Sequence, residues 1–319
     1  EPLAQAGLER LQRSCQVTVR LGLSPHELLR IIGDYDGLVV RGATRVTEGV
    51  LVAGSRLVVV GRAGVGVDNI DLGVATRRGI IVVNSPTGNT VAVAEHTIAL
   101  MLCLTRHICQ ANASAHDGRW EKKHLLGSEL RDKTLGLVGL GHVGAAVASR
   151  AGGLELQVIA YDPFVSPERA ARLKVRMVNL DELLAPSDYV SLHAPSTERT
   201  RGMIGARELG LMKPGARLIN CARGDLVVED ALVRALKEGV IAGAALDVFS
   251  DEPHISSALR ECSNLLLTPH LGASTEEAQS RAAEQVARQV VDVLNGRSPS
   301  YPLDAPALSA EEMTFSQPY

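Results

Sequence analysis

Residues 134–162 read TLGLVGLGHVGAAVASRAGGLELQVIAYD, and this stretch decides the fold. It predicts a short buried strand, a glycine-rich turn, an Ala-rich helix and a second strand that ends on an acidic residue. Gly139, Gly141 and Gly144 have the G-x-G-x-x-G spacing of a dinucleotide-binding loop. In such a loop the first glycine permits a tight turn, the second lets the backbone approach a pyrophosphate, and the third lets helix and strand pack closely.

The residues around this loop indicate which dinucleotide it binds. Unpaired N–H groups at the helix start attract an anion, and the helix dipole reinforces that attraction. Asp162 follows the second strand about 20 residues beyond the glycines, where a carboxylate accepts hydrogen bonds from a ribose diol. It would repel a 2′-phosphate, and Pro163 and Phe164 offer no guanidinium to bind one. The stretch therefore predicts NAD rather than NADP, with a plain packing turn as the weaker alternative.

The composition excludes several classes of protein. The chain has 319 residues, of which 45% are hydrophobic, 22% charged and 3% aromatic, as in a two-domain α/β protein. A net charge of −3 without any Lys/Arg run argues against nucleic acid or an anionic membrane as a partner. The five cysteines show no metal-ligand spacing, which predicts free thiols in a reducing, cytoplasmic compartment and no metal site. No secretory signal is visible, and the apolar run 98–104 is too short to span a bilayer.

The pattern of strands and helices predicts two domains. In the first 86 residues the predicted strands are 38–40, 57–60 and 80–83, with helices between them that include 25–32 behind the cap Ser24. The chain opens on a helix-like segment, 3–11, so we expect that a first strand is missing. The turn-rich residues 84–89 mark the first domain crossing, and a long helix follows at 90–105.

The second domain is predicted to contain a parallel, doubly wound sheet, because its strands alternate with helices. Its predicted strands are 135–140, 157–161, 189–192, 217–220, 242–248 and 265–268. The last helix, 276–294, is predicted to return to the first domain, which would make that domain discontinuous.

Polar side chains gather where these strands end. In an open α/β sheet, ligands bind beyond the carboxyl ends of the strands. His193, Arg223, Asp247 and His270 each follow a predicted strand at that edge. A single strand-end His or Arg is more often structural or a solvated charge. Their convergence around one dinucleotide site favours a functional role for Arg223 and His270, and less clearly for His193.

These residue types suit the oxidation of a 2-hydroxy acid. That reaction needs a base for the hydroxyl proton while hydride leaves for the nicotinamide, and an imidazole has the right proton affinity near pH 7. A carboxylate would orient the imidazole, and a guanidinium would bind the substrate carboxylate at two points. His270, Glu252 and Arg223 could fill these roles, although Asp251 is an equal neighbour of Glu252 by spacing alone.

Five motifs spread over nearly the whole chain resemble one enzyme family. They are residues 61–71, 84–94, 220–224, 245–249 with Glu252-Pro253, and 268–275. Together they resemble the D-isomer-specific 2-hydroxyacid dehydrogenases. This resemblance implies an α/β protein of two domains, each a doubly wound parallel sheet. A Rossmann-type NAD domain, 87–274, would be inserted into a discontinuous, flavodoxin-like substrate domain of residues 1–86 and 275–319.

The resemblance also implies roles for individual residues. The catalytic residues would be Arg223, Glu252 and His270. The cofactor contacts would be Val65, Gly139, Gly141, His142, Val143, Gly144, Asp162, Ala194, Cys221, Ala222, Arg223, Asp247, His270, Leu271, Gly272 and Ala273. Among these, Asp247 would meet the nicotinamide amide. The substrate's phosphate would be bound by Arg41, Arg62 and Asn89, and Lys122 and Lys123 could add charge from a neighbouring protomer.

The implied activity is the NAD-dependent oxidation of 3-phospho-D-glycerate to 3-phosphooxypyruvate, the first step of L-serine biosynthesis. The alternatives are a glyoxylate or hydroxypyruvate reductase and, from another class, an NAD-sensing corepressor. The resemblance further implies a homodimer or homotetramer, and a catalytic core without the regulatory domains of longer members. Gly42 stands where a Ser is common, which weakens the substrate assignment, and Glu155, Asp225 and Val228 also depart from the family pattern.

Overall fold

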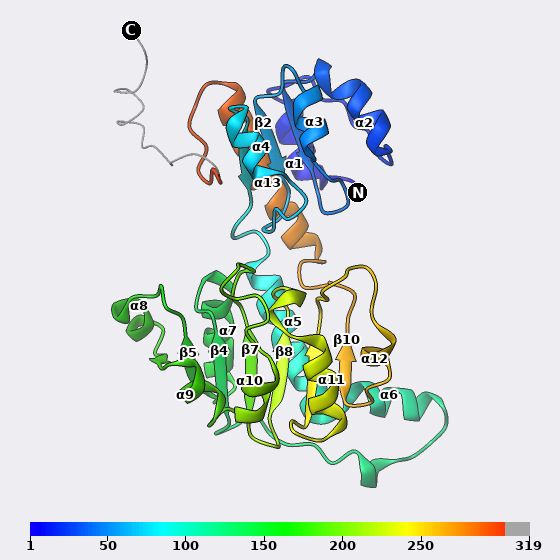
Figure 1. Ribbon diagram of the computed structural model, residues 1–319, viewed down its shortest axis with the longest axis vertical. Helices are drawn as coiled ribbons and strands as arrows, with labels where there is room; N and C mark the ends of the chain where they lie inside the picture. Colours follow the sequence, from blue (N-terminus) through cyan, green and yellow to red (C-terminus); the bar gives the residue numbers. More distant parts are fainter. Residues whose placement is uncertain (304–319) are drawn as a thin grey trace. The chain divides into compact units, whose positions relative to one another are not determined.

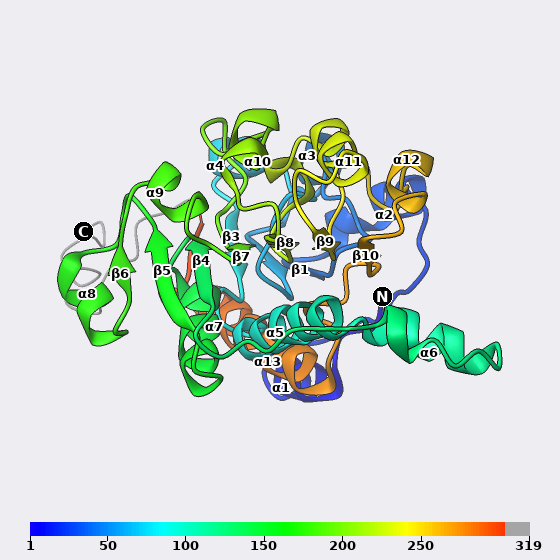
Figure 2. The same ribbon diagram turned by 90° about the horizontal axis from the view of Figure 1, so that it is seen from below.

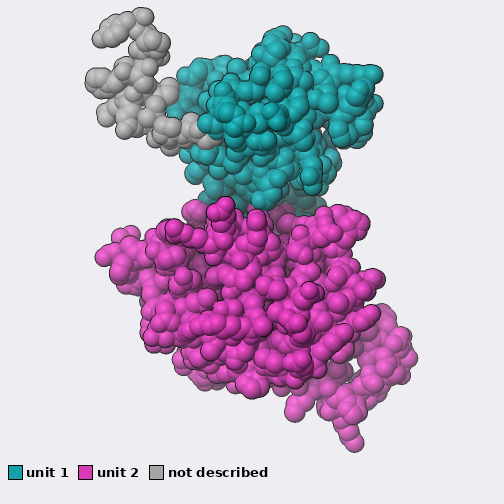
Figure 3. Space-filling view, in the orientation of Figure 1, with its two compact units in different colours: residues 1–90, 274–319 teal, residues 91–273 magenta. Residues whose placement is uncertain are grey.

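The computed structural model describes residues 1–303. Residues 304–319, which are predicted from the sequence to belong to the substrate domain, lie outside the described residues. The described chain forms two compact units, coloured separately in Figure 3. The first unit is Glu1–Thr90 together with the chain from Ser274 onward, and the second unit is Val91–Ala273. The chain thus crosses between units at 90/91 and 273/274, against 86/87 and 274/275 in the prediction from the sequence.

The second unit contains a parallel sheet of seven strands, drawn in Figure 1. Its strands are β4 (Thr134–Val138), β5 (Gln157–Tyr161), β6 (Arg176–Met177), β7 (Tyr189–Leu192), β8 (Arg217–Asn220), β9 (Gly243–Leu246) and β10 (Leu265–Leu267). Their order is β10-β9-β8-β7-β4-β5-β6, and all neighbours are parallel. The chain runs outward from β4 to β6 and then resumes at β7 on the other side of β4. The carboxyl ends of β4 and β7 therefore form the switch point at which such sheets bind ligands.

Helices cover both faces of this sheet, as Figure 2 shows. The helices of this unit are α5 (Thr90–Arg106), α6 (Ile108–His116), η2 (Lys122–His124), α7 (His142–Gly153), α8 (Pro167–Arg172), α9 (Leu180–Leu184), α10 (Ala206–Leu211), η3 (Gly224–Leu226), α11 (Glu229–Lys237) and α12 (Ser257–Arg260). Leu135 and Leu137 of β4 pack with α5 and α7, whereas Val138 packs with α9, α10 and α11. Successive strand residues point to opposite faces, so a run of apolar residues supplies both cores at once.

The length and apolarity of α5 bear on the prediction that the apolar run 98–104 is too short to span a bilayer. Among the described residues, only α5 and α6 taken together reach the length and apolarity of a membrane span, and they are bent by 63°. No single described helix does so.

The first unit contains a smaller parallel sheet in the order β1-β2-β3. Its strands are β1 (Gly37–Val40), β2 (Val59–Arg62) and β3 (Ile81–Asn84), and its helices are α1 (Gln5–Gln12), α2 (Pro25–Ile31), η1 (Ile32–Asp34), α3 (Glu48–Ala53), α4 (Leu72–Arg77) and α13 (Glu276–Leu294). The helices α2, α3 and α4 pack on one face, and α1 and α13 on the other. A Cβ on Gly61 would lie 2.5 Å from a methyl group of Val286, so Gly61 lets α13 lie directly on β2.

Most predicted elements coincide with the observed ones, and the differences have physical causes. The predicted strand 57–60 is observed two residues later, as β2. The reason is that Gly61 and Arg62 pair with β1 and β3, whereas Leu57 is buried but lies before the strand begins. The two-residue strand β6 is too short to produce a periodic pattern. The predicted start of α2 is confirmed in detail, since Ser24 and Glu27 form a reciprocal capping box.

Candidate active site

The glycine loop after β4 has the close contacts that its spacing predicts. Gly139 has a φ of 100°, and a Cβ there would lie 2.8 Å from the carbonyl carbon of His193. A Cβ on Gly144 would lie 2.2 Å from the carbonyl oxygen of Gly139. At Gly141, by contrast, no described atom lies within 4 Å of an added Cβ, and no side chain of the described residues caps α7. The loop therefore leaves open space beside Gly141 at the start of α7, where the N–H groups of a helix favour a pyrophosphate.

Asp162 lies at the carboxyl end of β5 and is bonded to the same loop. One carboxylate oxygen accepts a hydrogen bond from the Leu140 N–H at 2.8 Å, and the other accepts one from the Phe164 N–H at 2.9 Å. A carboxylate offers about four lone-pair sites, so two remain for the hydroxyls of a ribose. The loop and this carboxylate together fit an adenine dinucleotide without a 2′-phosphate.

His270 and Glu252 form a hydrogen-bonded pair in the second unit. The Nδ1 atom of His270 lies 2.7 Å from Oε2 of Glu252, whose Oε1 accepts a hydrogen bond from the Phe249 N–H at 3.1 Å. Of the two acidic residues that spacing left open, Glu252 is the one bonded to the imidazole. Since an ionised carboxylate only accepts hydrogen bonds, Nδ1 carries the proton and Nε2 is left as an acceptor. The His270 side chain is 50% exposed, so Nε2 can accept a proton from a bound molecule.

The turn that carries Arg223 is held by Asn220, a fully buried residue at the end of β8. Its Nδ2 donates to the Arg223 carbonyl at 2.8 Å, and its Oδ1 accepts from the Ala222 N–H at 3.0 Å. The Arg223 guanidinium donates to the Ala222 carbonyl at 2.7 Å. Sequence reasoning missed this role of Asn220, although a polar residue at the end of a buried strand was the available signal.

Gly224 brings the Arg223 turn against the loop that carries Glu252. A Cβ on Gly224 would lie 2.0 Å from the carbonyl carbon of Phe249, which is backbone and cannot rotate away. We expect Gly224→Ala to lower the free energy of unfolding by about 1–3 kcal/mol, as overpacking does, and to reduce turnover by displacing Arg223. Thermal unfolding and steady-state kinetics would measure both effects.

The matched control for this substitution is Gly152→Ala on α7. No described atom lies within 4 Å of a Cβ at Gly152, and alanine is favoured over glycine in a helix. The control should therefore be as stable as the original protein or more so. Equal stability and turnover of Gly224→Ala would contradict the close packing of the two loops.

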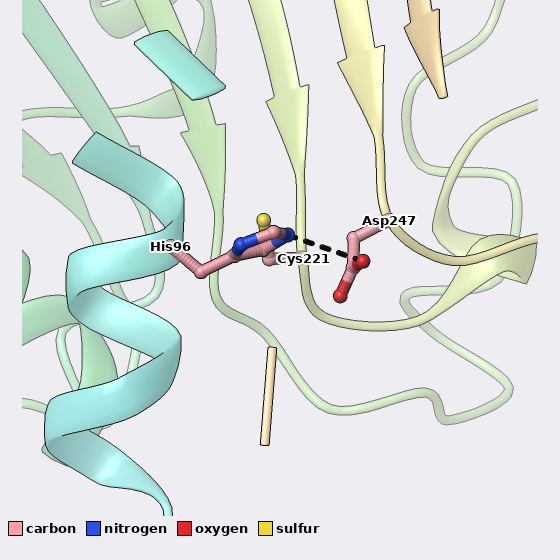
Figure 4. Close-up of side chains that lie close together, drawn as sticks. All are labelled: His96, Cys221 and Asp247. Carbon is pink, nitrogen blue, oxygen red and sulfur yellow. Dashed lines mark hydrogen bonds and ion pairs between the residues drawn. The ribbon is translucent and has the colours of Figure 1, made fainter. Parts of the chain in front are cut away.

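A cluster of partly buried His96 with buried Cys221 and Asp247 lies at the carboxyl edge of the sheet, and Figure 4 shows that it joins α5 to two strand ends. Their potential ligand atoms lie within 4.8 Å of one another. Burial raises the pKa of the Cys221 thiol to about 12, so the thiol is protonated near pH 7. The Asp247 oxygens already accept hydrogen bonds from the N–H groups of Leu271 and Gly272. Within the cluster, the Nε2 atom of His96 and the Oδ1 atom of Asp247 are hydrogen-bonded at 3.2 Å.

His193, the least clear of the strand-end candidates, has a structural position. Its Nε2 lies 2.9 Å from the Ser191 hydroxyl, and its backbone N–H donates to the Val138 carbonyl at 2.7 Å. Desolvation of the imidazole lowers its pKa to about 4, so the ring is neutral near pH 7. His193 thus supports the glycine loop through its backbone.

The other predicted cofactor contacts of the second unit all follow strands at the carboxyl edge of the seven-stranded sheet. They are His142 and Val143 after β4, Ala194 after β7, Cys221 and Ala222 after β8, and Leu271, Gly272 and Ala273 after β10.

The predicted substrate residues belong to the first unit, where the Arg62 side chain lies beside the loop that carries Arg41. The backbone of the Arg41 loop is held by Asn69, whose Nδ2 donates to the Arg41 carbonyl at 2.9 Å. A Cβ on Gly42 would lie 3.8 Å from a guanidinium nitrogen of Arg62, so Arg62 reaches the same loop. Glu1 accepts a hydrogen bond from the Gly42 N–H at 2.9 Å, which anchors the loop.

The remaining two predicted residues of the first unit have different surroundings. Val65 accepts a hydrogen bond on its carbonyl from Asn84 at 2.6 Å. The Asn89 Oδ1 is buried and has no hydrogen-bond partner among residues 1–303. An unpartnered buried oxygen is rare in folded proteins, which makes Asn89 a candidate for contact with a bound molecule.

The second unit thus combines a doubly wound sheet, a glycine loop with the spacing of a dinucleotide site, and the hydrogen-bonded pair of His270 and Glu252. Among known families, the model of the "D-isomer specific 2-hydroxyacid dehydrogenase, NAD binding domain" matches residues 98–272. The chain belongs to this family.

Three relatives illustrate the similarity. D-3-phosphoglycerate dehydrogenase of Synechocystis is 49% identical over 100% of this chain and 58% of its own length. The enzyme of the same name from Archaeoglobus fulgidus is 44% identical over 100% of this chain and 61% of its own length. A protein of Thermus thermophilus has a crystal structure with a TM-score of 0.87 and 37% identity, covering 95% of this chain and 98% of that one. The chain thus spans 58% and 61% of the two curated relatives.

Proposed function

We propose that this chain is the catalytic part of an NAD-dependent D-3-phosphoglycerate dehydrogenase, which oxidises 3-phospho-D-glycerate to 3-phosphooxypyruvate at the start of L-serine biosynthesis. The observation that carries the proposal is the 2.7 Å pair of His270 and Glu252 in the NAD-binding unit. The names and the 49% and 44% identities of the curated relatives support the choice of substrate.

In the proposed reaction three residues act on the hydroxy acid. The Nε2 atom of His270 takes the proton of the substrate's hydroxyl group, and Glu252 stabilises the imidazolium that forms. Arg223 binds the substrate carboxylate, since a planar guanidinium matches two carboxylate oxygens. Bound NAD would supply the acceptor for the hydride that leaves C2 of the substrate. The proton and the hydride together account for the two hydrogens removed.

The cofactor is proposed to lie along the glycine loop, with its pyrophosphate at the start of α7 and its ribose at Asp162. Gly141 supports this placement because its backbone faces open space. The loops after β7, β8 and β10 would line the nicotinamide end mainly through backbone and packing.

The first unit is proposed to bind the substrate's phosphate through Arg41, Arg62 and Asn89. Supporting observations are the closeness of Arg62 to the Arg41 loop and the buried, unpartnered oxygen of Asn89. Lys122 and Lys123 would come from a second protomer of a homodimer or homotetramer. All five cysteines are free thiols, which supports a place in the reducing cytoplasm.

Steady-state assays with NAD would test the proposal. We expect turnover of 3-phospho-D-glycerate with a kcat/KM at least about 100-fold above that for D-glycerate, because charge-assisted hydrogen bonds to the phosphate are lost without it. Equal rates with and without the phosphate would instead favour a glyoxylate or hydroxypyruvate reductase. NAD binding without turnover of any hydroxy acid would favour an NAD-sensing corepressor.

A further inference from the structure

The Asp247 carboxylate, at the end of β9, is the most heavily bonded side chain of the candidate site. It is 1% exposed. Its Oδ1 accepts hydrogen bonds from the Thr268 hydroxyl at 2.6 Å and the Leu271 N–H at 2.7 Å, and lies 3.2 Å from Nε2 of His96. Its Oδ2 accepts one hydrogen bond, from the Gly272 N–H at 2.8 Å. The two oxygens are therefore used unequally.

The surroundings of His96 determine which of its nitrogens carries the proton. Its Nε2 lies 3.2 Å from Asp247 Oδ1 and 3.3 Å from Thr268 Oγ1. The Thr268 hydroxyl proton is committed to Asp247, so that oxygen presents only lone pairs to the imidazole. Since Nε2 meets two acceptors, it carries the proton. His96 therefore donates from α5 to Asp247 at the end of β9, the pair drawn in Figure 4, and also to Thr268 at the end of β10.

The Oδ2 atom of Asp247 has one lone pair left. A carboxylate oxygen has two lone pairs, and whereas Oδ1 meets three donors, Oδ2 accepts one hydrogen bond among the described residues. Burial opposes ionisation of Asp247, but hydrogen bonds from His96, Thr268, Leu271 and Gly272 outweigh it and hold the pKa of Asp247 below its usual value. The free lone pair thus belongs to a desolvated, ionised acceptor, which is suited to an amide N–H donor.

We propose that His96 is a positioning residue that acts through Asp247. Its Nε2–H, together with the Thr268 hydroxyl and the Leu271 N–H, fixes the carboxylate through Oδ1 and so orients Oδ2 to accept a hydrogen bond from the carboxamide N–H of the nicotinamide. The inference rests on the proposed function, because it takes NAD as the cofactor and Asp247 as its nicotinamide contact.

The same network reaches the residue proposed as acid and base. The Asp247 carbonyl accepts a hydrogen bond from the His270 N–H at 2.8 Å, and the His270 backbone has a φ of 55°. A non-glycine residue in this left-handed region needs surrounding structure to hold it there. His96, through Asp247, therefore links the placement of the nicotinamide to that of the His270 backbone.

Two variants of His96 separate hydrogen bonding from packing. His96→Gln retains an N–H donor at a similar reach, whereas His96→Leu fills comparable space without a donor. The probes are NADH and its reduced 3-acetylpyridine analogue, whose acetyl group replaces the carboxamide and has no N–H. Dissociation constants are measured by calorimetry on the purified protein, without any substrate.

We expect His96→Leu to raise the dissociation constant of NADH by about 10-fold, the usual effect of losing a charge-assisted hydrogen bond. The dissociation constant of the acetylpyridine analogue should stay within about threefold of its value for the original protein. His96→Gln should restore NADH binding to within about threefold of the original protein. Equal losses for both probes would show that His96 acts only through packing and would overturn the proposal. So would unchanged NADH binding in His96→Leu.

A second measurement keeps the proposal testable if His96→Leu does not fold. Nitrogen-15 NMR of the unaltered protein without cofactor should show the proton of His96 on Nε2, and a proton on Nδ1 alone would overturn the proposal. Failure of either test leaves the dehydrogenase assignment intact, because neither uses turnover. Failure of the proposed function would instead appear as an unaltered protein that binds NADH but does not oxidise 3-phospho-D-glycerate, or that does not bind NADH at all.

Discussion

Replacing His270 with alanine is expected to lower kcat by about 100- to 10,000-fold, the usual contribution of a general base. The substitution removes the Nε2 acceptor that the Glu252 pair leaves available. It retains the backbone N–H that donates to the Asp247 carbonyl, so the loop should keep its position. NADH should accordingly bind within about threefold of its original affinity. Initial-rate kinetics and NADH fluorescence titration would measure the two quantities.

The control for His270→Ala is His26→Ala, which removes an exposed imidazole from α2. It should leave kcat unchanged, because His26 belongs to none of the proposed contacts. Near-normal turnover of His270→Ala would remove His270 from the proposed mechanism. A parallel loss of NADH binding would indicate instead that the loop had collapsed.

Arg223→Ala is expected to lower kcat/KM for the hydroxy acid by about 100- to 10,000-fold, since two charge-assisted hydrogen bonds are each worth about 1.5–3 kcal/mol. Arg223→Lys should recover only part of this loss, because an ammonium keeps the charge but not the planar, two-point geometry. Asn220 holds the turn through backbone atoms of residues 222 and 223, so the turn should survive both substitutions. Steady-state kinetics with varied hydroxy acid would separate kcat from KM.

Arg172→Ala provides the matched control, because Arg172 is an exposed arginine in the last turn of α8. Its kcat/KM should equal that of the unaltered protein. If Arg223→Ala retained the original KM and kcat for the hydroxy acid, the substrate carboxylate would have to be bound elsewhere.

The sequence was informative where local signals decide the structure. The strand Arg217–Asn220 and the helix Glu276–Leu294 were predicted with their observed bounds, because turn residues or a capping threonine adjoin them. The glycine loop could also be predicted from the sequence, because its spacing follows from steric requirements of the turn and of helix packing. Strand β2 was displaced by two residues because strand pairing, which is not local, outweighed hydrophobicity there.

The candidate site was less accessible to sequence reasoning. Spacing alone left Asp251 and Glu252 equal, and only family resemblance separated them before the 2.7 Å contact was seen. His96 had no local signature, since a lone histidine in an apolar helix is usually a core residue and its partner Asp247 lies 151 positions away. His193 occupied a promising strand end, but its desolvation depends on the packed fold.

The return of α13 to the first unit sets the order in which a growing polypeptide can complete its two units. Val59 and Val83, on neighbouring strands, are covered by Val286 and Val290 of α13. Those covering residues are synthesised after the whole of Val91–Ala273. The second unit is therefore fully synthesised before the first unit is complete. It can fold on the ribosome while the strands of the first unit are not yet covered by α13.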